Sequence, residues 1–171
     1  DTEIPLGHGE SMMFPRVEAR MLQDLDVQPN DECLEIGTGS GFVTACLAHM
    51  GKHVDSVDLY ADLSQQAEKN LHSVDINNFN LYIDDAGYGW EGNPGKQYDV
   101  IAVTGSISEY TPAFEQRLKV GGRLFVIVGT APAMQAMLIT REDHSQFNRQ
   151  VLFDTVIKAL EGTELSAKFK F

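Results

Sequence analysis

Residues 34–42 read LEIGTGSGF, and this stretch decides the fold of the chain. A short apolar run, typical of a buried strand, leads into glycines at alternate positions, Gly37, Gly39 and Gly41. A helical pattern over residues 42–50 begins at once. Glycine permits a tight turn and lets a ligand approach the backbone, and a helix N-terminus presents free N–H groups. The stretch therefore predicts a strand–loop–helix unit that binds a ligand.

Two classes of ligand fit such a loop. Dinucleotide-binding folds carry G-x-G-x-x-G, but Phe42 occupies the third glycine position here, so the spacing is G-x-G-x-G. Glu35 lies two residues before Gly37, where its charge would repel a pyrophosphate and attract a cation. A sulfonium nucleoside with an amino-acid tail carries positive charge on its sulfur and its ammonium group. We therefore favour this ligand and keep a nicotinamide-dependent oxidoreductase as a distant alternative.

Further acidic residues follow the next two predicted strands. Asp58 closes the strand pattern of residues 53–59, and Asp85 closes that of residues 80–86, with Asp84 as its neighbour. One such acid is more often a turn former or a helix cap. Because the carboxyl ends of successive parallel strands meet at one crevice, the acids together favour a ligand site. Asp58 suits the ribose hydroxyls, and Asp85 suits an adenine amino group.

The remaining patterns alternate between strand and helix, which predicts an α/β fold with a mostly parallel sheet. We expect a single domain over residues 1–171, with an irregular N-terminal segment (1–15) and a core (16–171). Helices are predicted over residues 16–25, 63–71 and 114–118, and strands over 98–105 and 123–129. Two last strands, residues 137–142 and 147–156, have no helix between them and predict an antiparallel pair at the sheet edge.

Composition narrows the function. The net charge is −12 and the pI is about 4.7, which disfavours a nucleic-acid or anionic-membrane partner. Cys33 and Cys46 form no CxxC motif, so a reducing, cytoplasmic location is expected. His49 and His53 have the spacing of helical zinc ligands, but Gly51 between them ends the helical pattern. We therefore predict no metal site.

The chain resembles the class I S-adenosylmethionine-dependent methyltransferases and, more narrowly, the protein-L-isoaspartate O-methyltransferase family. DTEIPLGHG (residues 1–9) is similar to that family's D-x-P-L-x-x-G-x-G segment, and LEIGTGSGF is similar to its cofactor loop. HVDSVDL, DDA, YDVIAVTGS and LKVGGRLFVIVG follow in the family's order. The resemblance implies a Rossmann-like, seven-stranded sheet with a reversed strand near the C-terminal edge and helices on both faces. It also implies methyl transfer to the α-carboxylate of L-isoaspartyl residues, which starts protein repair and leaves S-adenosylhomocysteine.

The same resemblance implies which residues bind S-adenosylmethionine. The residues around the glycine loop would line the methionine tail of the cofactor. Asp58 would hold the ribose, and Asp85 with Ala86 would border the adenine. The residues assigned in this way are Glu35, Gly37, Thr38, Gly39, Ser40, Gly41, Asp58, Leu59, Asp85 and Ala86.

The chain departs from the family pattern at residues 10–15. The family carries Q-T-I-S-x-P, whereas this sequence reads E-S-M-M-F-P. Aligned on the proline, Met13 replaces the serine, and a thioether cannot donate a hydrogen bond to a carboxylate. Glu10 replaces the glutamine, and its charge would repel a carboxylate acceptor. No catalytic residue is assigned, although Ser11 is a candidate, and Ser11, Met13 and Thr104 are expected to border the acceptor.

Three functions therefore stay open. The first is a methyltransferase of the isoaspartyl-repair type, acting on a protein or peptide carboxylate. The second is a methyltransferase of the same fold with another acceptor, including a small molecule. The third is a protein that binds S-adenosylmethionine without catalysis. The family usually has a helical segment before its N-terminal motif, and we expect this extension to be missing from the sequence.

Overall fold

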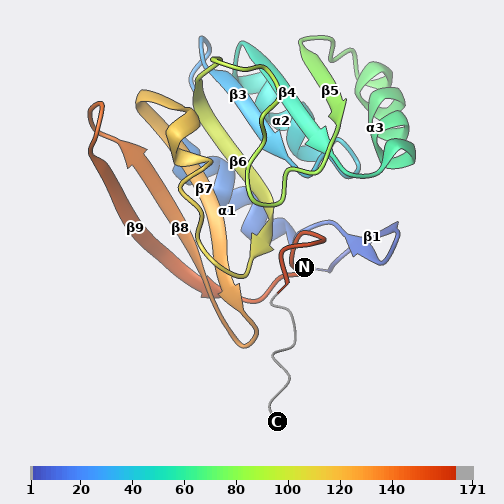
Figure 1. Cartoon of the computed structure of the whole chain (residues 1–171). Helices are drawn as coiled ribbons and strands as arrows, with labels where there is room; N and C mark the ends of the chain where they lie inside the picture. The colour runs from blue at the N-terminus through green and yellow to red at the C-terminus, as the bar shows by residue number, and fades with distance from the viewer. Residues whose placement is uncertain (1, 165–171) are drawn as a thin grey trace.

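The computed structural model describes residues 2–164, within which one mixed sheet of seven strands and a separate two-stranded hairpin are formed (Figure 1). Residues 1 and 165–171 of the predicted domain lie outside the described residues. The order across the sheet is β5-β4-β3-β6-β7-β8-β9. The strands are β3 (Glu32–Ile36), β4 (His53–Asp58), β5 (Phe79–Ile83), β6 (Tyr98–Ile107), β7 (Leu118–Thr130), β8 (Ala133–Arg141) and β9 (Phe147–Thr155).

β8 is the reversed strand near the C-terminal edge. The five strands from β5 to β7 are parallel to one another, whereas β8 is antiparallel to both β7 and β9. The predicted α/β sheet and the predicted antiparallel pair at its edge are therefore confirmed.

Apolar strand residues alternate between the two faces and form two core layers. Within β6, Val100 belongs to one layer and Ile101 to the other, and both are fully buried. Leu124 and Phe125 of β7 divide in the same way. This is the pattern of a strand covered on both faces, and it explains the continuous apolar runs in the sequence.

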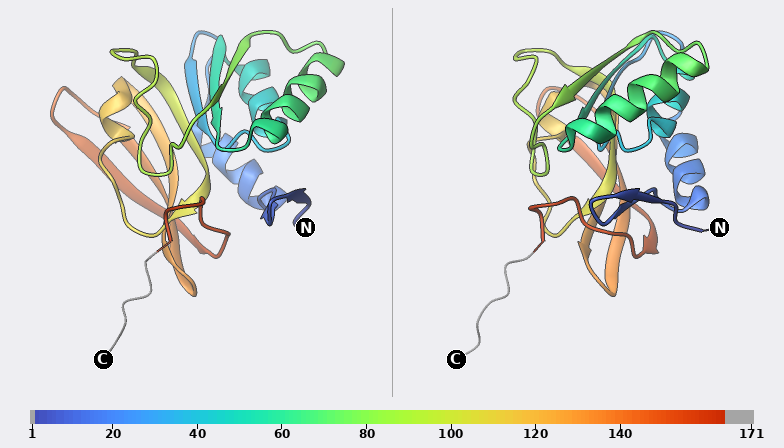
Figure 2. Two further views of the ribbon diagram at one scale, coloured as in Figure 1. Left: turned by 45° about the vertical axis from the view of Figure 1, so that its right-hand side comes forward. Right: turned by 90° about the vertical axis from the view of Figure 1, so that its right-hand side faces the viewer.

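Three α-helices cover one face of the sheet. They are α1 (Pro15–Leu25), α2 (Phe42–Met50) and α3 (Ala61–Ser73). Proline at the first position of α1 suits a helix start, because its missing N–H would have no partner there. The chain runs β3-α2-β4-α3-β5 in one direction across the sheet, and right-handed crossovers then place α2 and α3 on the same side (Figure 2). α1 packs against α2 and β7.

The opposite face of the sheet is covered mainly by irregular segments. After β5 the chain returns to β6, on the other side of β3, so the following connections cover the second face. Residues 84–97 and 108–117 cover it with one 3₁₀ turn, η1 (Glu115–Arg117), as their only regular helix. The helix predicted over 114–118 is thus present as a single 3₁₀ turn, and this turn is the helical part of the cover on the second face. Arg117 instead donates to the carbonyls of Gly92 and Lys96, which fixes the segments by hydrogen bonds.

The N-terminal hairpin and the C-terminal end of the described chain both lie at the carboxyl edge of the sheet, where Lys158 Nζ donates to the Gly9 carbonyl (Figure 2). Within the N-terminal segment, β1 (Pro5–Gly7) and β2 (Glu10–Ser11) pair as a hairpin, so the expectation of an irregular segment is corrected. Residues 156–163, here called the C-terminal strap, cross the end of β6. Ser106 fixes the strap, because its N–H donates to the Lys158 carbonyl over 3.1 Å and its carbonyl accepts from Leu160 N–H over 2.8 Å. No helix among the described residues is long and apolar enough to cross a membrane.

Candidate functional site

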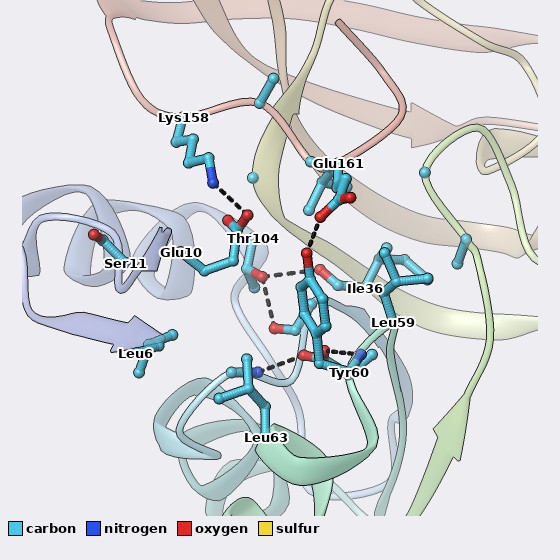
Figure 3. Close-up of a pocket in the computed structure, with 18 of the residues that line it drawn as sticks. Leu6, Glu10, Ser11, Ile36, Leu59, Tyr60, Leu63, Thr104, Lys158 and Glu161 are labelled. Atoms are coloured by element: carbon cyan, nitrogen blue, oxygen red, sulfur yellow. Dashed lines mark hydrogen bonds and ion pairs between the residues drawn. The ribbon is translucent and has the colours of Figure 1, made fainter. Parts of the chain in front are cut away.

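A pocket of about 850 Å³, counted with the part open to solvent, lies at the carboxyl ends of β3, β4, β5 and β6 (Figure 3). β3 and β6 are neighbours whose following connections leave toward opposite faces of the sheet. Such a switch point separates the loops and opens a crevice, which is where open α/β sheets bind ligands. The hairpin β1–β2 and the C-terminal strap form the outer wall.

The glycine loop after β3 requires glycine at position 37. The Gly37 φ angle is +96°, and a Cβ atom there would lie 2.3 Å from Thr104 Oγ1. Thr104 Oγ1 lies 2.7 Å from the Gly37 carbonyl and 2.9 Å from the Ile36 carbonyl, both of which accept from it. Thr104 therefore fastens the loop to β6 and, with Gly37 and Gly39, lines the pocket.

Asp58 fixes the other side of the same loop. One carboxylate oxygen accepts from Gly39 N–H over 2.8 Å, and the other accepts from Tyr60 N–H over 2.9 Å. Burial raises the pKa of Asp58 above its ordinary value, although backbone hydrogen bonds from Gly39 and Thr38 oppose the increase. The side chain lines the pocket at the end of β4, next to Leu59.

Glu35 is fully buried and has one carboxylate oxygen without a partner. Its Oε2 accepts from Ser56 Oγ over 2.6 Å and from Thr44 Oγ1, whereas Oε1 has no hydrogen-bond partner in the described part of the chain. Burial raises the pKa of Glu35 to about 8, despite the hydrogen bonds from Ser56 and Thr44. Glu35 lines a smaller adjoining pocket of about 310 Å³ together with Thr38 and Ser40. A buried, unpaired oxygen beside a pocket indicates a place for a hydrogen-bond donor or a cation.

Asp84 and Asp85 both line the pocket after β5, but they are engaged differently. Asp84 uses both oxygens within its own turn, accepting from Trp90 Nε1 over 3.1 Å and from Asp85 N–H over 2.9 Å. Asp85 uses Oδ1, which accepts from Gly87 N–H over 3.2 Å. This difference favours Asp85 as the ligand-facing acid, with Ala86 beside it in the pocket wall.

Of the residues predicted to bind the cofactor, Gly41 alone lies outside the linings of both pockets. Gly41 precedes α2 with a φ angle of +84°, and a Cβ atom there would lie 3.2 Å from Ala67 Cβ of α3. Glycine at position 41 therefore allows the loop to pack closely against α3.

The N-terminal hairpin and the residues after it border both pockets through Ser11, Met12 and Met13. The Met13 side chain is 6% exposed and belongs to the core layer under α1, so it offers no hydrogen-bond donor at this position. The charge of Glu10 is balanced by an ion pair with Lys158 Nζ of the C-terminal strap. The expectation that Glu10 would repel a carboxylate acceptor is therefore corrected, because Lys158 offsets its charge. The sequence pattern did not reveal this ion pair.

The sequence analysis missed several pocket residues, and the polar ones with partners across the pocket are Tyr60, Lys158 and Glu161. The Tyr60 hydroxyl donates to the Glu161 carboxylate, which joins the β4–α3 loop to the strap (Figure 3). The Tyr60 ring also stacks on His8 at a centroid distance of 4.0 Å. The Tyr60–Glu161 pair joins positions 101 residues apart and the Glu10–Lys158 pair joins positions 148 apart, and no sequence motif marks either pair.

The pocket lining is strongly acidic. In the part of the chain that the structure describes, its only cationic side chain is Lys158, and its acidic ones are Glu3, Glu10, Asp58, Asp84, Asp85 and Glu161. Such a lining favours a ligand with positive charge. Among residues 2–164 there is no cluster of three His, Cys, Asp or Glu side chains that could hold a metal ion.

A family model described as protein-L-isoaspartate(D-aspartate) O-methyltransferase matches residues 1–162. A protein-L-isoaspartate O-methyltransferase of Aeromonas hydrophila is 37% identical over 153 residues, which cover 89% of this chain and 72% of the relative. A protein of the same name from Protochlamydia amoebophila is 32% identical over 165 residues, covering 96% of this chain and 78% of the relative.

A solved structure has the same fold. It is a Plasmodium falciparum protein assigned as a protein-L-isoaspartate O-methyltransferase, in complex with S-adenosyl-L-homocysteine. The TM-score is 0.80 with 23% identity, over 94% of this chain and 80% of that one. At this level of identity the likeness concerns the architecture.

Proposed function

The chain belongs to the protein-L-isoaspartate(D-aspartate) O-methyltransferase family, and from this premise we propose that it is an S-adenosylmethionine-dependent enzyme that methylates a carboxylate on damaged proteins or peptides. One observation carries the proposal. The family match over residues 1–162 includes every segment that lines the pocket, from the N-terminal hairpin to the strap. The acceptor is a protein or peptide in the reducing cytoplasm, which agrees with the two free cysteines.

The residues of the pocket suit this cofactor. The unpaired Oε1 of Glu35 offers a place for the ammonium group of the methionine tail, and Gly37 and Gly39 leave the backbone open to the tail. Asp58 lines the pocket and would accept hydrogen bonds from the ribose hydroxyls, and Asp85 with Ala86 would border the adenine. The acidic lining favours a sulfonium cation, which supports this donor over a dinucleotide phosphate.

When bound, S-adenosylmethionine supplies an activated methyl group, which passes to a carboxylate oxygen and leaves S-adenosylhomocysteine and a methyl ester. A carboxylate is already ionised at neutral pH, so the acceptor needs no general base from the protein. The work of the chain is therefore to position the acceptor and to exclude water. Ser11 and the core-packed Met13 narrow the acceptor side of the pocket, and Thr104 holds the loop beneath it.

A transfer assay tests this proposal. The protein is incubated with S-adenosylmethionine carrying a labelled methyl group and with a peptide that contains one L-isoaspartyl residue. The control peptide has ordinary aspartate at the same position. We expect label on the isoaspartyl peptide alone, released by mild base as expected for a methyl ester. Absence of label above the enzyme-free background contradicts the proposal.

A methyltransferase with another acceptor is the second candidate, and Met13 is the observation that favours it. The family's serine position holds a buried thioether here, so one donor to an acceptor carboxylate is absent. Calorimetry with S-adenosylmethionine, followed by the transfer assay on a panel of carboxylate, amine and hydroxyl acceptors, separates the possibilities. Label on a different acceptor supports this candidate, and binding without any label supports a non-catalytic protein. Binding of NAD in place of S-adenosylmethionine would favour an oxidoreductase.

A further inference from the structure

The acceptor side of the pocket poses an electrostatic problem. An isoaspartyl acceptor brings a negative carboxylate into a lining that already contains six acidic side chains, so an unassisted approach is unfavourable. A site for such an acceptor needs a compensating positive group close to its rim. The inference that follows rests on the proposed function.

Among residues 2–164, Lys158 is the one cationic side chain in that lining, and its backbone position is fixed. The strap on which it lies is hydrogen-bonded to Ser106 of β6 through the Lys158 carbonyl and the Leu160 N–H. Leu160 packs against the same strand, because a Cβ atom on Gly105 would lie 2.6 Å from Leu160 Cδ2. The Lys158 side chain therefore extends from a firmly held segment toward the hairpin.

The Lys158 ammonium group keeps capacity for a further partner. It donates to the Gly9 carbonyl over 2.8 Å and pairs with the Glu10 carboxylate. An ammonium has three N–H donors, two partners are present, and the side chain is 44% exposed, so one donor is available to a further partner. Ser11 and Met13 line the same pocket, and the Met13 thioether supplies no hydrogen-bond donor.

We propose that Lys158 binds the acceptor carboxylate in this protein, with Glu10 as its ion-pair partner when no acceptor is present. The Lys158 ammonium group then donates the hydrogen bond to the acceptor carboxylate that Met13, which has no hydroxyl, cannot donate. Glu10 keeps the Lys158 side chain directed at the hairpin and limits its attraction for other anions.

The test compares two peptides in Lys158→Met, which keeps the unbranched shape of the side chain and removes its ammonium group. One peptide carries the isoaspartyl α-carboxylate, and the other carries an α-carboxamide in its place and acts as a competitive inhibitor. We expect the KM of the acid peptide to rise about tenfold, the size of one charge-assisted hydrogen bond, while the inhibition constant of the amide peptide stays within about twofold. Lys158→Arg should keep most of the preference for the acid.

Lys52→Met serves as the matched control, because Lys52 pairs with Glu32 at the opposite edge of the sheet. Thermal unfolding and the KM for S-adenosylmethionine report any structural effect of Lys158→Met. An unchanged ratio of acid to amide affinity in Lys158→Met would overturn the role of Lys158 and leave the proposed function intact. A wild-type protein that binds S-adenosylmethionine but labels no isoaspartyl peptide would instead remove the proposed function, and this inference with it.

Discussion

Glu35 and Asp58 are carboxylates on neighbouring parallel strands, yet their surroundings differ. Glu35 is enclosed among the hydroxyls of Ser56 and Thr44, so burial dominates and its pKa rises to about 8. Asp58 binds the backbone of the loop that it faces. The first side chain is therefore sensitive to pH near neutrality, and the second determines the shape of the loop.

Glu35→Gln tests the buried carboxyl through stability. Because the folded pKa of about 8 lies above the unfolded value, the folded state retains the proton that the unfolded state loses. The stability that Glu35 contributes is thus complete below the unfolded pKa and is lost as the pH rises through the folded pKa. We expect wild type to lose up to about 1.4 kcal/mol per pH unit in this window, relative to the variant. Urea unfolding of both proteins across this range, without cofactor, measures the difference, and parallel curves would contradict the raised pKa.

Asp58→Ala tests the proposed ribose contact. We expect it to weaken S-adenosylmethionine binding by about 1–3 kcal/mol, because charge-assisted hydrogen bonds to the hydroxyls are lost. Calorimetry gives the affinity, and urea unfolding without cofactor shows how much of the loss comes from the released Gly39 and Tyr60 N–H groups. Unchanged affinity would show that the ribose binds elsewhere.

At the scale of elements, the β3–α2 loop depends on its contact with β6. Thr104 occupies the space that a side chain at Gly37 would need, and it holds the Gly37 carbonyl. The loop therefore keeps its shape without cofactor, which reduces the ordering needed on binding.

Gly37→Ala tests this arrangement against Gly95→Ala. Both glycines have positive φ angles, +96° and +81°, but a Cβ atom on Gly95 would meet nothing within 4 Å. Backbone strain alone should cost Gly95→Ala about 1 kcal/mol, whereas the clash with Thr104 should bring Gly37→Ala to about 3 kcal/mol. Urea unfolding measures both, and equal costs would mean that the contact with Thr104 adds nothing.

At the scale of the whole molecule, the second face of the sheet is covered by irregular segments instead of α-helices. Hydrogen bonds from polar side chains hold these segments against the sheet. Asp55 of β4 is fully buried and accepts from Lys96 Nζ over 2.7 Å, Tyr98 OH over 2.8 Å and Asn93 Nδ2 over 3.1 Å. Burial alone would raise the pKa of Asp55, but the hydrogen bonds from Lys96 and its other partners outweigh burial and lower it. The segment 84–97 is thereby fastened to the sheet.

Asp55→Asn should destabilise the whole domain by about 2 kcal/mol, because the charge-assisted hydrogen bond from Lys96 is lost while Lys96 keeps Glu32 as a second partner. Since the folded pKa lies below the unfolded one, the contribution of Asp55 is present above the unfolded pKa and is lost as the pH falls through the folded pKa. Urea unfolding should therefore show a large difference between the two proteins at pH 7 and a smaller one under acid conditions. A constant difference would place the effect outside the ionisation of Asp55.

The sequence by itself determined the sheet, the glycine loop and the acids at the strand ends. Apolar periodicity and glycine spacing are local properties, and the order of parallel strands brings Glu35, Asp58 and Asp85 to one edge without further information. The N-terminal motif, read with the loop, narrowed the family to the one that matches residues 1–162.

Only the tertiary structure decided how the second face is covered and which charges meet at the pocket rim. Glu10 and Lys158 are 148 residues apart, and Tyr60 and Glu161 are 101 apart, so the path of the strap across β6 determines both pairs. On the second face, hydrogen bonds of Arg117 and Asp55 hold irregular segments against the sheet where helices were expected. No periodic pattern in the sequence predicts these bonds. The physical reason is that an element follows from neighbours along the chain, whereas a contact between distant side chains follows from the fold as a whole.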